Sequence, residues 1–390
     1  MNKKEYIRKK VEEKPVIAIC YDFDKTLSPD DMQAQGYIQS VGYDVSEFWT
    51  KSNDLAESND MDQNLAYMYL MMKEADGRIV FNKEKLAEYG SKVELFPGVD
   101  SWFERIKEYG KDKGVIIEHY IISSGLKEMI EGTSVAKNGA FEKIYASSFF
   151  YENGRSAKWP AQIVNYTNKT QFLFRIKKGV LDVNDPAVND YFPPERIRVP
   201  FSNIIYIGDS DTDVPCMKLV DTNGGYSIGV YNHKTLDKTK VQKMMREHRV
   251  KYYAPADYTE KSELDGLIKN IIDLVSIRSS IQDVNSKCYD ETIIAERTTD
   301  ISEREKNDAL YLLENSMSFA RTHEIISQMK QITKWNDRDV ERICQIVKSN
   351  GQVMGVSRDR DVKSFLASVI RGYKGNKIIV SEVEKTIGLE

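Results

Sequence analysis

The sequence predicts an α/β fold in which helices cover both faces of a parallel β-sheet. Short apolar runs of strand length alternate with stretches of helical patterning along the first 275 residues. Acidic residues directly follow two of these runs, Val16 to Tyr21 and Ile204 to Ile207. In open α/β sheets, ligands bind at this carboxyl end of the strands. The pattern therefore predicts both the fold class and the edge of the sheet that carries the site.

The strands of a parallel sheet buried on both faces are apolar nearly throughout, which allows their positions to be predicted. A helix over about Ser262 to Val275 would complete the domain. No element is predicted between Tyr151 and Thr167. In chain order, the expected strands are Val16–Tyr21, Val115–Ile122, Ile144–Phe150, Ile204–Ile207 and Tyr226–Val230.

The first strand leads into Asp22-Phe23-Asp24-Lys25-Thr26, which puts two carboxylates at its end. Residues two apart on a strand project to the same side, so Asp22 and Asp24 can face one ligand while Phe23 packs the other way. Two carboxylates this close repel one another unless a cation or a shared proton intervenes. Mg²⁺, which prefers oxygen ligands, is the expected cation, and the expected reaction is phosphoryl chemistry.

Three further motifs follow in the chain. A second acidic cluster, Asp209-Ser210-Asp211-Thr212-Asp213, stands at a second strand end. Ser123-Ser124-Gly125 follows another apolar run, and Lys169 opens an amphipathic stretch. Phosphoryl transfer requires in-line positioning and neutralisation by a cation, a lysine and hydroxyl or amide donors. The four motifs together supply these groups.

Each motif also has a purely structural interpretation. Asp209 to Asp213 can form a turn with a helix N-cap, where Ser, Asp and Thr are favoured. Ser123 to Gly125 can be a strand-to-helix turn. A single lysine is most often a solvated surface residue. Three other lysines stay alternatives for the role of Lys169, namely Lys158, Lys177 and Lys178.

In order and chemistry, the four motifs resemble the haloacid dehalogenase (HAD) superfamily, and within it the phosphoserine-phosphatase-like branch. The resemblance covers roughly residues 14–275 and implies a Rossmann-like core with an inserted helical cap. It also implies a Mg²⁺-dependent phosphatase that forms an aspartyl-phosphate. Asp22 would be the nucleophile. Asp24 would protonate the leaving oxygen and then activate water.

The resemblance implies roles for the other motif residues. Ser123 would hold the phosphoryl oxygens, and Ser124 and Gly125 would occupy adjoining substrate-binding positions. Lys169 would neutralise the nucleophile and the phosphate. The metal ligands would be Asp22, Asp209, the backbone carbonyl of Asp24, and Asp213 unless Asp213 instead orients Lys169.

The catalytic core would comprise residues 1–29 and 95–280, and the family resemblance makes residues 30–94 a helical cap. Ser28-Pro29-Asp30-Asp31 offers a helix start with proline at the first helical position. A closing cap suggests a small phosphorylated metabolite as substrate. Asp31 lies near the place where phosphoserine phosphatases read a substrate amine, and is a substrate-binding candidate. Apolar residues at helical spacing support helices in the cap: Leu65, Met68, Tyr69 and Met72.

The resemblance stops near residue 280, and residues 281–390 are predicted to form a helical accessory module. Asn336 would cap a helix that runs through Val347 and ends at Gly351. A further helix is expected over Asp361 to Arg371. Acidic and basic residues are interleaved here, as on a solvated surface rather than a nucleic-acid face. The expected roles are oligomerisation, docking of a protein partner or substrate gating.

Composition agrees with a globular protein that needs no disulfides. The net charge of −4 argues against a general polyanion-binding surface, so nucleic acid is not the favoured partner. The four cysteines are scattered, with no spacing typical of a zinc site. The polar start of the chain predicts no signal peptide or membrane span, and a cytoplasmic location.

Three functions are compatible with these residues. The leading hypothesis is a Mg²⁺-dependent phosphomonoesterase for a small phosphorylated metabolite. The second is a phosphotransferase or mutase that passes the phosphate of the same aspartyl-phosphate to an acceptor other than water. The third is a regulatory binding protein built on a phosphatase core. The substrate, the pathway and the oligomeric state cannot be predicted from this one sequence.

Overall fold

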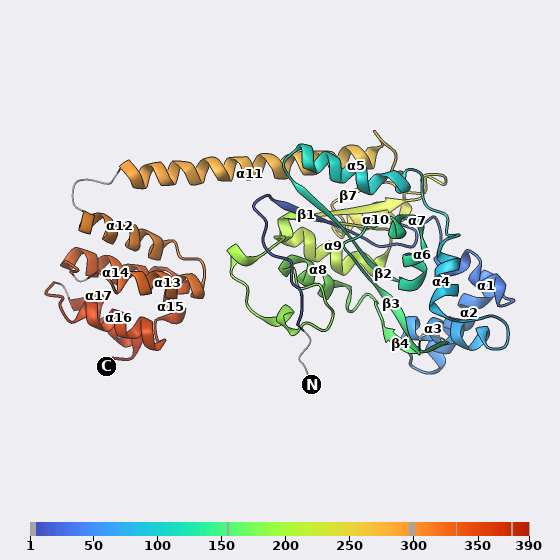
Figure 1. Cartoon of the computed structure of the whole chain (residues 1–390), viewed down its shortest axis with the longest axis horizontal. Helices are drawn as coiled ribbons and strands as arrows, with labels where there is room; N and C mark the ends of the chain where they lie inside the picture. The colour runs from blue at the N-terminus through green and yellow to red at the C-terminus, as the bar shows by residue number, and fades with distance from the viewer. Residues whose placement is uncertain (1–4, 154–155, 296–300, 333, 376, 390) are drawn as a thin grey trace. The chain divides into compact units, whose positions relative to one another are not determined.

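The computed structural model describes residues 5–153, 156–295, 301–332, 334–375 and 377–389. The chain forms two compact units (Figure 1). The first comprises Met1–Asp190 and Ile197–Ser279, and the second comprises Tyr191–Arg196 and Ser280–Glu390. The long helix α11 (Glu263–Ala295) runs from the first unit into the second.

The first unit contains a seven-stranded sheet in the order β4-β3-β2-β1-β5-β6-β7. All neighbouring strands are parallel except β3 and β4, which form an antiparallel pair at one edge. This sheet and the helical second unit confirm the predicted fold class. The strands are β1 (Val16–Tyr21), β2 (Ile116–Leu126), β3 (Lys143–Glu152), β4 (Ser156–Gln162), β5 (Ile204–Gly208), β6 (Tyr226–Tyr231) and β7 (Tyr252–Pro255).

The central strand β1 explains how the sheet is covered, because all six of its residues are buried. Ile17, Ile19 and Tyr21 share one apolar core with α5 (Val99–Asp112) and the first part of α11. The alternate residues, including Ala18, belong to the core on the other face. Helices α8 (Lys169–Lys178) and α9 (Val214–Thr222) supply that second core. The two-sided burial accounts for the uninterrupted apolar run in the sequence.

Between β1 and α5 the chain is helical, as the sequence predicts for residues 30–94. The expected helix start at Pro29 is wrong, because residues 29–30 form a bend and a short 3-10 helix begins only at Met32. Met68 lies in the core as expected, but Tyr69 is 43% exposed. The helices are α1 (Tyr37–Ser40), α2 (Val45–Ser58), α3 (Gln63–Ala75) and α4 (Lys83–Gly90).

Two strands of the sheet were not predicted. β4 lies within the segment for which no element was expected, and contains Pro160 and the exposed Trp159. β7 is only four residues long. β4 has no continuous apolar run, and the run in β7 is too short to stand out in the sequence. Both strands lie at edges of the sheet, where less burial is needed. The other helices of this unit are α6 (Lys127–Gly132), α7 (Ser134–Lys137) and α10 (Thr239–Arg246).

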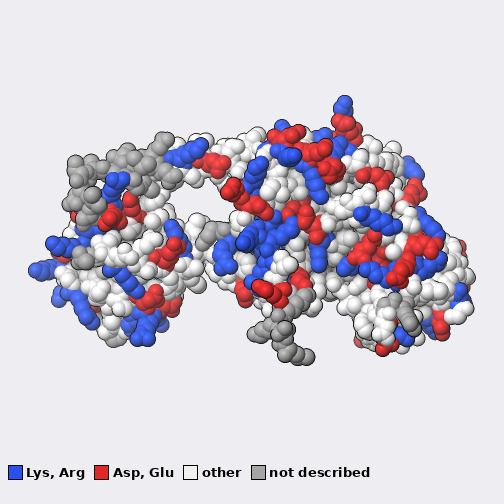
Figure 2. All heavy atoms as spheres, in the orientation of Figure 1, with Lys and Arg blue, Asp and Glu red and all other residues white. Residues whose placement is uncertain are grey.

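The second unit has its own apolar core, built by its helices. Asn336 caps α14 as predicted, accepting from the N–H of Asp339 at 3.0 Å. Gly351 does not end that helix, because Asn350 separates the two helices and Gly351 begins α15. Acidic and basic side chains are interspersed over the visible face of this unit (Figure 2). The helices are α12 (Ile301–Glu314), α13 (Phe319–Met329), α14 (Asp337–Ser349), α15 (Gly351–Val356), α16 (Arg360–Ile370) and α17 (Lys377–Ile387).

Across the described residues, no helix combines the length and the apolar character needed to cross a membrane.

Candidate active site

Asp22 and Asp24 lie at the carboxyl end of β1, in the middle of the sheet. The chain turns sharply after them, since three successive N–H groups donate to the carbonyl of Phe23. Lys25 has a φ of 58° in this turn, a left-handed conformation that is uncommon for residues other than glycine. The turn brings the Asp24 carboxylate to the N–H of Met32, at 2.9 Å. The two acids are therefore held by backbone geometry.

Lys169 is the lysine that meets the first acid. It begins α8 and is fully buried, and its Nζ lies 3.2 Å from Asp22 Oδ2 and 2.8 Å from Asp213 Oδ1. The alternatives lie elsewhere, since Lys158 is exposed on β4 and Lys178 donates to the backbone carbonyls of residues 188 and 190. Lys177 lies over the ring of Phe201. The geometry thus selects Lys169 among the four lysines.

The buried Asp213 carboxylate accepts several hydrogen bonds next to the cavity. Its Oδ1 accepts from Lys169 and from the Tyr206 hydroxyl, both at 2.8 Å. Its Oδ2 accepts from the N–H and the hydroxyl of Ser210, at 3.1 and 3.0 Å. A Cβ on Gly208 would lie 2.5 Å from Asp213 Oδ2, so only glycine leaves room for this carboxylate. These contacts hold Asp213 where it can orient Lys169.

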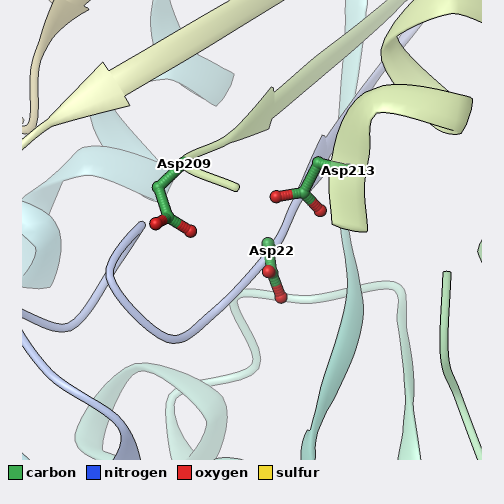
Figure 3. A group of neighbouring side chains, drawn as sticks. All are labelled: Asp22, Asp209 and Asp213. Atoms are coloured by element: carbon green, nitrogen blue, oxygen red, sulfur yellow. The ribbon is translucent and has the colours of Figure 1, made fainter. Parts of the chain in front are cut away.

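Asp22, Asp209 and Asp213 form a group of carboxylates whose oxygens lie within 4.8 Å of one another (Figure 3). Asp22 comes from the end of β1, and the other two follow β5. Oxygen donors at this spacing fit a hard divalent cation such as Mg²⁺. The Asp24 carboxylate does not belong to this group. The donor set therefore fits the predicted metal.

The Ser123-Ser124-Gly125 motif lies within the last part of β2, at a shift in the pairing with β3. The Gly125 N–H donates to the Ser123 hydroxyl oxygen at 3.1 Å. A Cβ on Gly125 would lie 2.8 Å from Asp24 Oδ2 and 2.4 Å from the methyl carbon of Met32. Glycine is thus required for space, because the motif packs directly against the second acid.

A cavity of about 490 Å³ opens over these groups. Asp31 lines it, and the Asp31 carboxylate pairs with Lys25 at 2.8 Å. Lys169 and Asp213 do not line the cavity themselves. Lys169 contacts the lining residue Asp22, and Asp213 accepts a hydrogen bond from the lining residue Ser210. The predicted site residues on the cavity wall are Asp22, Asp24, Asp31, Ser123, Ser124, Gly125 and Asp209.

Comparison with models of known protein families assigns the chain to one family. The family model of haloacid dehalogenase-like hydrolases matches residues 19–218, just over half of the chain. The chain belongs to this family. The match includes all four motifs and confirms the superfamily that the sequence resembles. The protein is thus a HAD-type hydrolase.

The hydrolase is also similar to individual proteins. It is 28% identical over 288 residues to an uncharacterized protein of Borreliella burgdorferi, across 65% of this chain and 95% of that one. A probable phosphoserine phosphatase from Vibrio cholerae has 12% identity and a TM-score of 0.44, over 68% of this chain and 67% of that one. A cytosolic 5'-nucleotidase IIIB bound to cytidine has 13% identity and a TM-score of 0.41, over 68% and 87%. These structural similarities are too low to assign a substrate.

Burial raises the pKa values of three carboxyl groups at the cavity of the hydrolase. It raises the pKa of Asp22 to about 6, although the charge of Lys169 opposes the shift. Burial and the nearby Asp213 raise the pKa of Asp209 to about 7. Burial, followed by the charges of Asp31 and Asp22, raises the pKa of Asp24 well above its usual range. Burial thus favours the protonated form of all three acids, while the charge of Lys169 favours the ionised form of Asp22.

Several residues of the site were not predicted. Lys25 was part of the first motif, and its place beside Asp24 was a signal that could have been used. Tyr206 stands two positions before Gly208 on β5, and so projects to the same side of the strand. Ser210 and Thr212 belong to the predicted second acidic cluster, although the sequence assigns them no role. Asn64 and Asn165 have no local signal, because loops and helix starts far apart in sequence bring them together. The further lining residues are Met61, Asp62, Gln63, Asn64, Asn165, Tyr166, Ser210, Thr212 and Lys240.

Proposed function

We propose that this hydrolase is a Mg²⁺-dependent phosphomonoesterase for a small phosphorylated metabolite, and that it acts through an aspartyl-phosphate on Asp22. The observation that carries the proposal is the placement of the two acids at the carboxyl end of β1. Asp22 is in contact with the buried Lys169, whose positive charge favours the carboxylate that a nucleophile needs. Asp24 lies on the wall of the same cavity, where burial raises its pKa and so favours the protonated form that a general acid needs.

In the first step, a carboxylate oxygen of Asp22 attacks phosphorus, and the bond from phosphorus to the leaving oxygen breaks. Asp24 gives its proton to that oxygen, so the product leaves as a neutral alcohol. In the second step, Asp24 takes a proton from water, whose oxygen attacks the phosphorus of the acyl phosphate. Phosphate is released and Asp22 is regenerated as a carboxylate.

The other residues neutralise charge and position the phosphate. Lys169 places a buried positive charge beside Asp22, where negative charge accumulates. The Ser123 hydroxyl accepts from Gly125 and keeps its own proton available for a phosphoryl oxygen. Mg²⁺ held by Asp22, Asp209 and the Asp24 carbonyl would offset the charge of the phosphate, with Asp213 as a further ligand or as the group that orients Lys169.

We also propose that residues 30–94 act as the substrate-selecting cap over the core of residues 1–29 and 95–280. Asp31, Asp62 and Asn64 of this segment line the cavity, which supports the proposal. For residues 281–390, oligomerisation or docking of a protein partner stays our proposal. A cytoplasmic location, and the absence of nucleic-acid and membrane partners, stay predictions.

The test is phosphate release from a panel of phosphorylated amino acids, sugars and nucleotides with Mg²⁺, comparing the wild type with Asp22→Asn. Release that depends on Mg²⁺ and is lost in the variant supports the proposal and identifies the substrate class. Transfer of phosphate to an added alcohol or sugar, without release, would replace the proposal with the phosphotransferase or mutase. Folded protein that neither releases nor transfers phosphate would favour a regulatory binding protein.

A further inference from the structure

The cap and the phosphate-binding motif are joined by one buried hydrogen bond. Tyr67, on α3, is 5% exposed, and its hydroxyl donates to the carbonyl of Ser124 at 2.8 Å. The edge of the Trp49 ring packs against the tyrosine ring, with centroids 5.9 Å apart. Tyr67 therefore has a fixed ring and a hydroxyl with a defined acceptor.

The direction of this hydrogen bond follows from its acceptor, because a backbone carbonyl oxygen can accept a hydrogen bond but cannot donate one. The Tyr67 proton therefore points to Ser124. Helix α3 makes a second hydrogen bond to the core. Val164 lies in the loop that leads to Lys169, and its carbonyl accepts from Asn64 of α3 at 2.8 Å.

The Ser124 carbonyl and the Gly125 N–H belong to the same peptide unit. No cis peptide bond occurs among the described residues, so this carbonyl and N–H point in opposite directions from a rigid plane. Tyr67 holds the carbonyl end of the plane, and the N–H end donates to the Ser123 hydroxyl oxygen at 3.1 Å. A rotation of the plane would break both bonds together.

We infer that Tyr67 is a positioning residue for the phosphate, acting through this peptide plane on the Ser123 hydroxyl. With one lone pair of the Ser123 oxygen occupied by Gly125, its proton is directed to the cavity, where a phosphoryl oxygen can accept it. The cap helix α3 thereby sets the donor that the core presents to its ligand. This inference rests on the proposed function for its kinetic consequence, but not for its effect on phosphate binding.

The experiment compares Tyr67→Phe with Tyr37→Phe in the full chain. Tyr37 is the matched control, because it is also buried in the cap and donates to a backbone carbonyl at 2.5 Å, but that carbonyl belongs to Met71 of the cap itself and not to the phosphate-binding motif. With Mg²⁺ and p-nitrophenyl phosphate, we expect Tyr67→Phe to lower kcat/KM about tenfold and Tyr37→Phe to change it less than twofold. Equal effects of the two substitutions would overturn the inference.

A double-mutant cycle with Ser123→Ala separates positioning from general damage. We expect Tyr67→Phe to have almost no further effect in the Ser123→Ala background, because its target hydroxyl is gone. A full tenfold loss in that background would overturn the inference.

Calorimetric binding of inorganic phosphate gives a readout that does not need turnover. We expect Tyr67→Phe, and not Tyr37→Phe, to weaken it. If the wild type hydrolyses no monoester but phosphate binding shows this difference, the proposed function fails while the inference stands. Phosphate binding that is unchanged in Tyr67→Phe would overturn the inference.

Discussion

The first unit buries two clusters of charged side chains at opposite ends of its sheet, and they are balanced differently. At the amino end, Glu118 on β2 contacts Arg198 and Lys9, at 2.7 and 2.6 Å, and accepts from Tyr120. At the carboxyl end, Lys169 is the buried cation beside Asp22 and Asp213. Asp24 and Asp209 add further carboxyl groups to the same cavity.

The pKa shifts reflect this difference. Burial acts to raise the pKa of Glu118, but the hydrogen bonds from Lys9 and Tyr120 and the charge of Arg198 outweigh it and lower the pKa. The pKa values of Asp22, Asp24 and Asp209 are raised. In the amino-end cluster, the buried Glu118 has two cations beside it, and the further acids that these cations contact, Glu12 and Glu142, are partly exposed. In the carboxyl-end cluster, the buried acids Asp22 and Asp213 share one buried cation, Lys169. In a structural cluster, the protein's own cations neutralise the buried acids. In a binding site, some of the acidic charge is left to be neutralised by the ligand.

The largest expected effect is a loss of turnover on substitution in the carboxyl-end cluster, without the loss of stability expected for the amino-end cluster. Asp22→Asn should lower turnover on the order of 10⁴-fold, because it removes the proposed nucleophile. In the metal-free protein it should not lower Tm, because it removes one acid from a cluster that has too many. Phosphate release and thermal melts measure the two quantities. A fall in Tm as large as that of a Glu118 variant would contradict the proposed difference between the clusters.

The second prediction concerns stability at the other end of the sheet. Glu118→Gln leaves the buried Arg198 with only the partly exposed Glu12 as a carboxylate partner and should cost about 3 kcal/mol of the free energy of unfolding. Turnover by the folded fraction should change less than twofold, since the cluster lies away from the cavity. Urea unfolding and phosphate release at low temperature test both parts. Lost turnover in fully folded protein would show that the amino-end cluster also serves the site.

The third prediction concerns pH. The raised pKa values of Asp22, about 6, and Asp209, about 7, mean that the metal-free folded protein holds protons that the unfolded chain releases above about pH 4. Their contribution to stability is therefore present at low pH and lost as the pH rises through 6 to 7. Glu118, with its lowered pKa, contributes in the opposite sense, and its stabilisation is lost as the pH falls.

Mg²⁺ should compete with those protons. Its affinity should rise up to about tenfold per pH unit below pH 6 and level off above pH 7. Calorimetric titration at several pH values, in buffers of different ionisation enthalpy, measures both affinity and proton release. Asp209→Asn is the control, and should weaken binding and reduce the number of protons released. An affinity that does not depend on pH between 5.5 and 7.5 would contradict the prediction.

The smallest expected effect comes from removing most of the second unit. The part of α11 that packs against the first core ends at Val275, so a chain that stops at residue 285 keeps that packing. Turnover should change less than twofold. Phosphate release and the molar mass in solution are the measurements, with the full chain as control. Lost turnover in a folded truncated chain would link the second unit to the site, in place of partner docking or oligomerisation.

The sequence predicts the central part of the fold and the three motifs at strand ends because their physical signals are local. A strand buried on both faces is apolar throughout, and acids at its end stand out against that run. Lys169 has no such signal, since its burial depends on where α8 begins and on the acid of another motif. Tyr67 and Asn165 contact the site from loops and helices whose positions depend on the whole fold. Edge strands β4 and β7 lack the burial that makes a strand visible in sequence.

The position of β1 in the centre of the sheet also has a consequence during synthesis. Its neighbours β2 and β5 are made much later, and Asp213 follows Asp22 by 191 residues. At about 5–20 residues per second, roughly 10–40 s pass between the synthesis of these two acids. During that interval the nascent chain has Asp22 but neither the complete carboxylate group nor the helix that carries Lys169 in its final place. The carboxylate group can therefore be completed only after most of the first unit has been synthesised.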